Sequence, residues 1–323
     1  MSLPWLEAHK NALHERLEAG RLGHAPLIQG PKGVGKRELA RWLAERILCL
    51  NPAGPDPCGQ CRACELMASG THPDFFGIDI PEDRQSIPVD AIRGLIEKMQ
   101  LTPSVGAARV GLFVDADAMN RNAANALLKT LEEPAPGAWL ILCSDQPASL
   151  PATIRSRCQQ LALRPPPLET AARWLSEICS EVDEESRSAA LVLAGGAPLA
   201  ACAMLEHGEF ERGLSILETL VEPASDRRSG KLLDEWQHDA AGTWQWLARW
   251  LALIMKRLRG VSTVDVPMAA RLPADLPAER VARLWEQALE GRRTASAGSL
   301  RQDLSLGKWL LEWDALMESR SRR

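Results

Sequence analysis

Four closely spaced cysteines form a candidate metal site. Cys49, Cys58, Cys61 and Cys64 follow the pattern C-x8-C-x2-C-x2-C. Four thiolates at about 2.3 Å from one ion make a closed tetrahedral zinc site, and short C-x2-C turns bring the sulfurs together without strain. A closed site has no open position for water, so its zinc would be structural. The alternative is a set of reduced free thiols.

The segment "GPKGVGKR", residues 30–37, has the spacing of a phosphate-binding loop. In such a loop, glycines let backbone N–H groups turn inward, the following helix N-terminus adds positive potential, and a lysine reaches the terminal phosphates. The candidate binding residues are Gly30, Gly33, Gly35 and Lys36. A hydroxyl residue normally follows the lysine and coordinates magnesium, whereas Arg37 offers no oxygen and adds like charge. The spacing predicts the loop geometry and leaves nucleotide binding open.

The stretch "VGLFVDADAMN", residues 110–120, has the character of the second half of such a site. Asp115 stands where a magnesium-contacting carboxylate belongs. Enzymes that hydrolyse ATP also need a carboxylate to polarise the attacking water, and the next residue is Ala116. Asp117 would share a face with Asp115 if the strand continued, but it lies a further step along the chain. These departures argue against ATP hydrolysis by this chain and leave the binding of ATP and magnesium undecided.

The elements that would position these residues alternate along the first half of the chain. Short apolar runs and helical stretches follow one another from about residue 25 to 163, as in a parallel sheet with crossover helices. Helices are expected over 36–48, from near Asp90, which can cap its helix, and from near Asn122. The predicted strands are 26–29, 75–80, 110–114, 139–143 and 159–163. Together these elements predict an α/β domain with a cysteine insertion at 49–64.

The proline run "RPPP", residues 164–167, marks a domain boundary because proline continues neither a helix nor a central strand. Beyond it only helical periodicity is present. The pattern predicts an α/β domain over 1–164, a small helical domain over 165–207 and a larger all-α domain over 208–323. That last part contains Trp236, Trp244, Trp246, Trp250, Trp285, Trp309 and Trp313. Such a concentration indicates a large buried helix surface or a subunit interface, with plain core packing as the alternative for each residue.

Composition limits the possible partners. With a net charge of −4 over 323 residues, no global field attracts nucleic acid or an anionic membrane, so any contact with DNA would be local or shared. The first residues lack an apolar signal core, which predicts a cytoplasmic protein. The apolar stretch 244–255 is interrupted by Arg249 and is shorter than the roughly 20 residues that a membrane span needs.

Five stretches agree in order and spacing with one known family. They are "HAPLIQGPKGVGK" at 24–36, the four-cysteine insertion, "HPDFF" at 72–76, "RVGLFVDADAMNRNAANALLKTLEEP" at 109–134 and "TIRSRCQ" at 153–159. With these motifs the chain resembles the clamp-loader subunits of bacterial DNA polymerase III, which are AAA+ proteins. It is similar to the δ′ family rather than to the γ/τ motor family. The motor family needs a hydroxyl after the lysine, a carboxylate after Asp115 and a lid arginine, where this sequence has Arg37, Ala116 and Leu199.

The resemblance implies a non-hydrolysing δ′ subunit with a helical lid at 165–207 and a helical collar at 208–323. Such a subunit works with γ/τ motor subunits and δ to load the sliding clamp onto primed DNA. It belongs to the polymerase holoenzyme without polymerase activity of its own. In this family the arginine of "SRC", here Arg157, acts in trans as an arginine finger on ATP bound by the neighbouring motor subunit. The residue itself could also be a solvated side chain or a partner of Glu132 or Glu133.

Two other readings remain. A γ/τ-like motor or another P-loop ATPase would show magnesium-dependent turnover by the isolated chain, against which Arg37 and Ala116 argue. A zinc-containing nucleic-acid binder would carry basic and aromatic residues near its cysteines. Residues 49–64 contain only one basic residue, Arg62, and no aromatic side chain.

Overall fold

The computed structural model describes residues 2–80, 86–222, 229–260, 276–296 and 301–321. The chain divides into two compact units. The α/β unit comprises Met1–Trp174 and Ala197–Ala200, and the helical unit comprises Leu175–Gly196 and Ala201–Arg323. The three-part division predicted from the sequence differs from this partition and stays a prediction, and parts of the range 208–323 lie outside the described residues.

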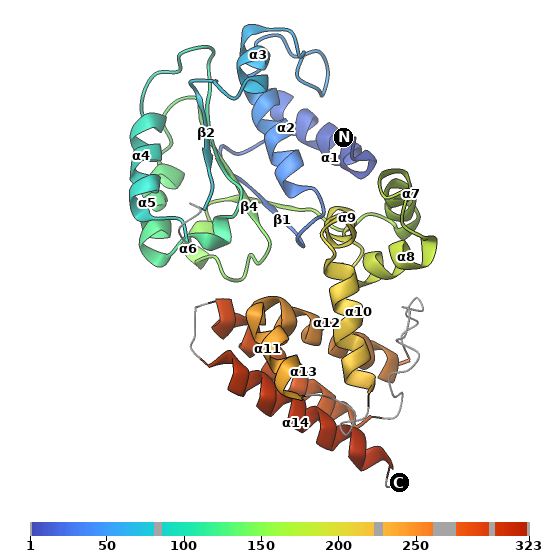
Figure 1. Cartoon of the computed structure of the whole chain (residues 1–323). Helices are drawn as coiled ribbons and strands as arrows, with labels where there is room; N and C mark the ends of the chain where they lie inside the picture. Colours follow the sequence, from blue (N-terminus) through green and yellow to red (C-terminus); the bar gives the residue numbers. More distant parts are fainter. Residues whose placement is uncertain (1, 81–85, 223–228, 261–275, 297–300, 322–323) are drawn as a thin grey trace. The chain divides into compact units, whose positions relative to one another are not determined.

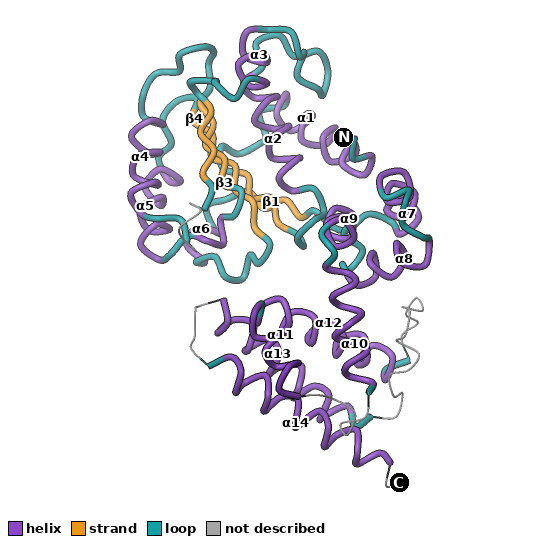
Figure 2. The backbone as a smooth tube through the Cα atoms, in the orientation of Figure 1, coloured by secondary structure: helices purple, strands orange, loops and turns teal. Residues whose placement is uncertain are grey.

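A five-stranded parallel sheet forms the centre of the α/β unit (Figure 2). Its strand order is β2-β3-β4-β1-β5, so the loop after β1 emerges beside the ends of β4 and β5. The strands are β1 (Pro26–Gln29), β2 (Phe75–Ile78), β3 (Arg109–Phe113), β4 (Ala138–Ser144) and β5 (Gln159–Ala162). All residues of β3 are buried, as expected for a parallel strand covered on both faces. The predicted strands are confirmed, with ends shifted by one or two residues.

Helices cover both faces of this sheet (Figure 1). Helix α2 packs against β1, β3 and β4, whereas α4 contacts β3 and packs against α5. The helices and 3-10 turns of this unit are η1 (Pro4–Leu6), α1 (Glu7–Glu18), α2 (Lys36–Leu48), α3 (Arg62–Ala68), α4 (Val89–Met99), η2 (Ala116–Ala118), α5 (Arg121–Glu132) and α6 (Ala152–Arg155). Leu27 and Leu142 of the sheet join Ile92 of α4 and Leu127 of α5 in one apolar core. This burial fixes the strand ends from which the loops emerge.

The two predicted helix starts differ in their caps. Asn120 caps α5, because its side chain accepts a hydrogen bond from the N–H of Ala123 at 2.9 Å. The expectation that Asp90 caps its helix is wrong. Helix α4 begins at Val89 after Pro88, so Asp90 lies inside the first turn, where its charge is favourable to the helix dipole.

The described part of the remaining chain is helical. Its helices are α7 (Leu168–Ile178), α8 (Glu184–Leu193), α9 (Pro198–Glu206), α10 (Glu209–Val221), α11 (Ser229–His238), α12 (Ala240–Leu258), α13 (Ala278–Ser296) and α14 (Gln302–Ser321). Trp250, Trp309 and Trp313 are buried and donate indole hydrogen bonds to backbone carbonyls within the helical unit. These side chains therefore stabilise the core of the chain itself. Among the described helices, none is both long and apolar enough to cross a bilayer.

Candidate functional sites at the two ends of helix α2

The phosphate loop lies between β1 and α2, as the sequence predicts. Gly33 and Gly35 have φ angles of +82° and +98°, a backbone region that side-chain-bearing residues rarely adopt. Gly30 has no room for a side chain, because a Cβ there would lie 2.0 Å from the carbonyl oxygen of Leu163. The glycines at these positions are therefore required by the fold of the loop.

The lysine of the loop already has two partners within the protein. Lys36 is 6% exposed, and its ammonium group donates to the carbonyl oxygen of Pro31 at 2.7 Å. The same Nζ lies 2.5 Å from Oδ1 of Asp145, the residue that follows β4. A buried ammonium group is stable only when it is paired, and this pairing is supplied by the chain.

Asp117 holds the segment that contains Asp145. Its carboxylate accepts hydrogen bonds from the N–H groups of Asp145 at 2.6 Å and Gln146 at 2.9 Å. It also accepts from the hydroxyls of Ser144 at 2.6 Å and Ser149 at 3.3 Å. The strand does not continue through Asp117 as considered above, because β3 ends at Phe113 and a 3-10 turn follows. Asp117 thus positions a loop.

Neighbouring residues of the α/β unit cover the phosphate loop. The N–H of Leu199 donates to the carbonyl oxygen of Gly33 at 3.0 Å, and a Cβ at Gly33 would lie 2.4 Å from the backbone nitrogen of Ala200. On another side, the indole of Trp5 donates to the carbonyl oxygen of Val34 at 2.9 Å. Residues from the start of the chain and from the start of α9 therefore fix the loop in this conformation.

Asp115 and Arg37 lie beside the Lys36–Asp145 pair. Arg37 forms an ion pair with Asp79, with Nη2 and Oδ1 2.9 Å apart, on side chains that are more than half exposed. Partial burial, followed by the charge of Asp145, raises the pKa of Asp115, while Arg37 opposes the shift. The structure thus brings the predicted magnesium carboxylate near the loop, but into a region that already holds other carboxylates.

The four predicted cysteine ligands meet at the other end of α2. Cys49 follows the helix directly, Cys61 precedes α3, and Cys64 lies in the first turn of α3. The Sγ atoms of Cys49 and Cys61 are 3.9 Å apart, those of Cys58 and Cys64 3.9 Å, and those of Cys61 and Cys64 3.5 Å. All four Sγ atoms lie within 4.8 Å of one another, so this cluster can hold a metal ion.

Backbone N–H groups point at these sulfurs. Cys58 donates its N–H to Sγ of Cys49, and Cys61 donates to Sγ of Cys58, both at 3.3 Å. Hydrogen bonds from the backbone of Gln60 and Cys61 lower the pKa of Cys58. Although burial opposes it, backbone hydrogen bonds from Cys64 and Leu50 lower the pKa of Cys61 to about 6. The thiolate, which is the metal-binding form, is therefore favoured at both residues.

Arg157 lies between α6 and β5, where it contacts a neighbouring carboxylate. Its Nε donates to Oε1 of Glu132 at 2.6 Å, and Nη2 also contacts this carboxylate. Its Nη1 donates to the carbonyl oxygen of Thr153 at 3.0 Å. Glu132 is one of the two possible partners, with Glu133, that the sequence offered as an alternative to the finger role. The arginine side chain is about one third exposed, so part of the guanidinium remains accessible.

Comparison with known proteins identifies the family. The family model described as "DNA polymerase III, delta subunit" matches residues 5–167. The DNA polymerase III subunit delta' of Escherichia coli is 36% identical over 86% of this chain and 84% of that protein. The corresponding Pseudomonas aeruginosa protein is 33% identical over 97% of both chains. The chain belongs to the DNA polymerase III δ′ family. The Salmonella typhimurium subunit tau is also similar, at 30% identity over 94% of this chain but 49% of its own length.

The resemblance to the δ′ family that the motifs indicated is thus confirmed, but two features of this δ′-family chain escaped the sequence reasoning. Asp145 received no role, although an acidic residue directly after an apolar strand could have drawn attention to it. Cys179 and Cys202, which were not considered as a pair, have Sγ atoms 3.5 Å apart. The Glu206 carboxylate lies 3.3 Å from Sγ of Cys202, which places three potential metal ligands together in the helical unit. Cys202 and Glu206 are one helical turn apart, which was the available signal.

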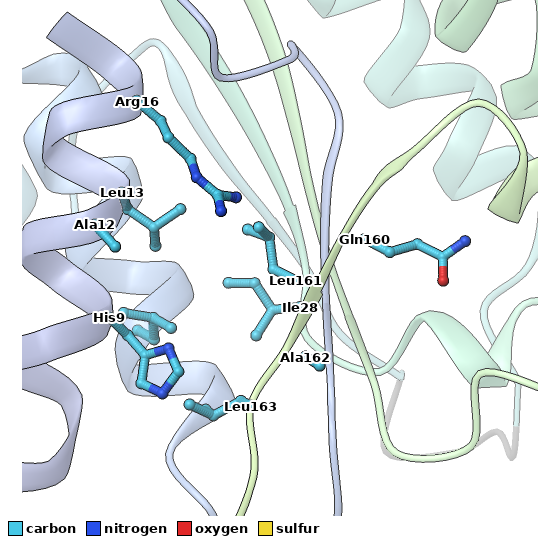
Figure 3. Close-up of a pocket in the computed structure, with 10 residues that line it drawn as sticks. His9, Ala12, Leu13, Arg16, Ile28, Gln160, Leu161, Ala162 and Leu163 are labelled. Carbon is cyan, nitrogen blue, oxygen red and sulfur yellow. The ribbon is translucent and has the colours of Figure 1, made fainter. Parts of the chain in front are cut away.

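A cavity of about 270 Å³ lies between α1 and the strands β1 and β5, at one edge of the sheet (Figure 3). Its walls come from α1, β1, α2 and β5, and His9, Leu13 and Arg16 of α1 point toward Ile28 and Leu161. No residue of the loop 30–37 lines it. This cavity is therefore distinct from the phosphate loop.

Proposed function

We propose that this chain is the non-hydrolysing δ′ subunit of a bacterial DNA polymerase III clamp loader. It works in the cytoplasm with γ/τ motor subunits and δ to place the sliding clamp on primed DNA, and it contacts DNA mainly through the complex. The observation that carries the proposal is the similarity to δ′ proteins over nearly the whole chain. The net charge of −4 supports a shared rather than an independent DNA contact.

The absence of intrinsic hydrolysis is supported by the chemistry of the loop. Arg37 offers no hydroxyl for magnesium, and Ala116 offers no carboxylate for the attacking water. The aspartate two residues beyond Asp115 is engaged by four hydrogen bonds from residues 144–149 and does not take over that role. Of the residues expected to act on a nucleotide, Lys36 of the loop and Asp115 after β3 are present in the sequence.

Arg157 is proposed as the residue through which this chain acts on ATP. A fixed guanidinium beside the γ-phosphate of a neighbouring subunit stabilises the charge that develops during phosphoryl transfer. Glu132 would be its resting partner in the free chain, because a carboxylate and a phosphate are alternative anionic acceptors for the same guanidinium donors. The finger would exchange one anion for the other when the complex assembles.

The test is ATP hydrolysis by a reconstituted loader that contains Arg157→Ala. We expect pre-steady-state phosphate release at the adjoining motor site to fall at least about tenfold. Assembly, measured by size-exclusion chromatography, should be unchanged. Glu132→Gln distinguishes the finger from a purely structural ion pair, because it breaks the same pair but keeps the guanidinium. If Glu132→Gln lowers hydrolysis as much as Arg157→Ala, or if Arg157→Ala has no effect, the finger role is wrong.

Zinc is the metal that we propose for the cysteine cluster. Sulfurs at about 2.3 Å from a tetrahedral zinc ion are about 3.8 Å apart. The three Sγ separations above, between 3.5 and 3.9 Å, agree with that edge length. With four thiolate ligands the ion would be structural and would tie the end of α2 to α3.

The roles of the two helical ranges follow from the resemblance to clamp-loader subunits. We propose residues 165–207 as a lid and residues 208–323 as the collar that joins the other subunits. The described residues of both ranges are helical, as a lid and a collar of this kind require.

A further inference from the structure

The phosphate loop of this chain contains its own anion. We infer that the carboxylate of Asp145 takes the place of a nucleotide phosphate on Lys36, so that Asp145 excludes nucleotides from the loop. The inference rests on the proposed function and deepens it, because it adds an absence of nucleotide binding, with its cause, to the proposed absence of hydrolysis. It rests on contacts between β4 and the loop that neither the loop motif nor the family comparison contains.

The first argument is the pairing of the buried charge. Lys36 is almost inaccessible to water, and its ammonium group contacts both the Asp145 carboxylate and the Pro31 carbonyl. A phosphate could reach this ammonium group only by displacing Asp145. The displaced carboxylate would then remain beside the phosphate as an unpaired like charge, which opposes binding.

The second argument is that Asp145 cannot easily move aside. Its backbone N–H and that of Gln146 are bonded to the Asp117 carboxylate. The preceding residue, Ser144, accepts a hydrogen bond from the N–H of Gly30 at 3.2 Å, which ties the same segment to the first glycine of the loop. The carboxylate is therefore presented to Lys36 from a segment that is fixed on both sides.

The third argument is the surplus of carboxylates around the loop. Asp115 and Asp79 join Asp145 there, and Arg37 is already paired with Asp79. A triphosphate would meet three carboxylates without the magnesium ion that normally offsets its charge, because the hydroxyl that helps hold magnesium is replaced by Arg37. The residues present do not fit a nucleotide, and Asp145 is the one that directly contacts the phosphate-binding lysine.

The experiment compares binding of ATP and of inorganic tripolyphosphate, both without magnesium, to wild-type chain and to Asp145→Asn by calorimetry. Asparagine keeps the size of the side chain and removes its charge. We expect Asp145→Asn to bind both probes at least about tenfold more tightly than wild type. Adding Lys36→Met to Asp145→Asn should abolish the gain.

A matched variant controls for the general effect of removing a negative charge. Asp79→Asn removes the carboxylate that pairs with Arg37 and should change affinity less than about threefold. Thermal unfolding verifies that each variant is folded, and Asp145→Ser replaces Asp145→Asn if the latter is not. If the folded Asp145 variant binds no more tightly than Asp79→Asn, or if wild type already binds as tightly, the inference is wrong.

The inference and the proposed function can fail separately. Assembly of the unmodified chain with motor subunits and δ tests the clamp-loader role and involves no substitution at the loop. A wild-type chain that does not assemble would contradict the proposed function. The calorimetric comparison concerns the isolated chain and would still decide the role of Asp145.

Discussion

The two ends of helix α2 carry two motifs that the sequence makes equally visible, yet their polar groups are partnered differently. At the C-terminal end, four thiols face one another, and backbone hydrogen bonds favour the thiolate form of Cys58 and Cys61. At the N-terminal end, Lys36 is paired with Asp145, and Arg37 with Asp79. The cysteine end has ligands that converge on a common centre, whereas the loop end has charges that neutralise one another.

This difference shows that the fold can require the shape of a motif even where the binding residues of that motif are paired with other residues of the chain. The loop glycines are held by their contacts with Leu163 and Ala200, so the loop shape is required by the fold even without a nucleotide. The cysteines have no comparable structural reason to gather, because four thiols in contact gain little from one another unless an ion binds them. A metal is therefore expected at one end of the helix and no nucleotide at the other.

The largest effect is expected from removing the metal. The double change Cys58→Ser and Cys61→Ser should abolish bound zinc and destabilise the α/β unit by at least about 3 kcal/mol, because binding free energy contributes directly to folding. The corresponding fall in Tm is on the order of 10 °C. Elemental analysis measures the bound zinc, and calorimetry measures the loss of stability and the fall in Tm. Cys158→Ala, outside the cluster, should retain one zinc per chain. A wild-type chain without metal would contradict the expectation that the cysteine end of α2 binds an ion.

Glycine substitutions near the two ends of α2 should differ in how much they lower the free energy of unfolding. Gly33→Ala meets both a φ of +82° and the backbone of Ala200 at 2.4 Å, so we expect a loss of about 2–4 kcal/mol. Gly54→Ala lies in the cysteine loop, the segment between Cys49 and Cys58, and has a similar φ of +74° but open space around it. This change should lower the free energy of unfolding by about 1 kcal/mol. Denaturant unfolding compares them. Equal losses would mean that residues 199 and 200 do not hold the phosphate loop.

The smallest effect concerns Asp115. Its pKa is raised above 3.8 in the folded chain by partial burial and then by Asp145, so its ionised form opposes folding at neutral pH. This cost is fully present above the folded pKa and disappears below the unfolded value, where the group is protonated in both states. Asp115→Asn should therefore raise Tm at pH 7 by on the order of 1 °C.

The gain from Asp115→Asn should shrink as the pH falls toward 4. Thermal melts of wild type and Asp115→Asn at several pH values measure it. A variant that is less stable than wild type at pH 7 would show that Asp115 has a stabilising partner at the loop and that the carboxylates there do not repel one another.

The sequence predicted what depends on local pattern. Apolar runs located the strands, the glycine spacing located the phosphate loop, and C-x2-C spacing brought the cysteines to one point, because each signal lies within a short segment. The same reasoning could not predict that Asp145 pairs with Lys36 or that Asp117 holds the segment that contains Asp145. Their contacts join the ends of β1, β3 and β4, and these ends become neighbours only through the strand order of the sheet.

The same limit applies to Arg157 and to the buried thiols. Glu132 was named as one possible partner of Arg157, but the choice between Glu132 and Glu133 depends on which side of α5 faces α6. The proximity of Cys179 and Cys202 depends on how the end of α7 meets α9. Pairings of this kind come from packing between elements, for which a single sequence carries little signal.

The indole contacts near α2 give the molecule optical reporters for its two sites. The sequence contains no tyrosine, so its intrinsic fluorescence comes from tryptophan. Trp5 donates to the carbonyl oxygen of Val34 in the phosphate loop, and Trp42 donates to Asp56 in the cysteine loop, each at 2.9 Å. Emission that is lost in Trp5→Phe reports on one end of the helix, and emission that is lost in Trp42→Phe reports on the other. The state of each end can thus be followed in solution without an attached dye.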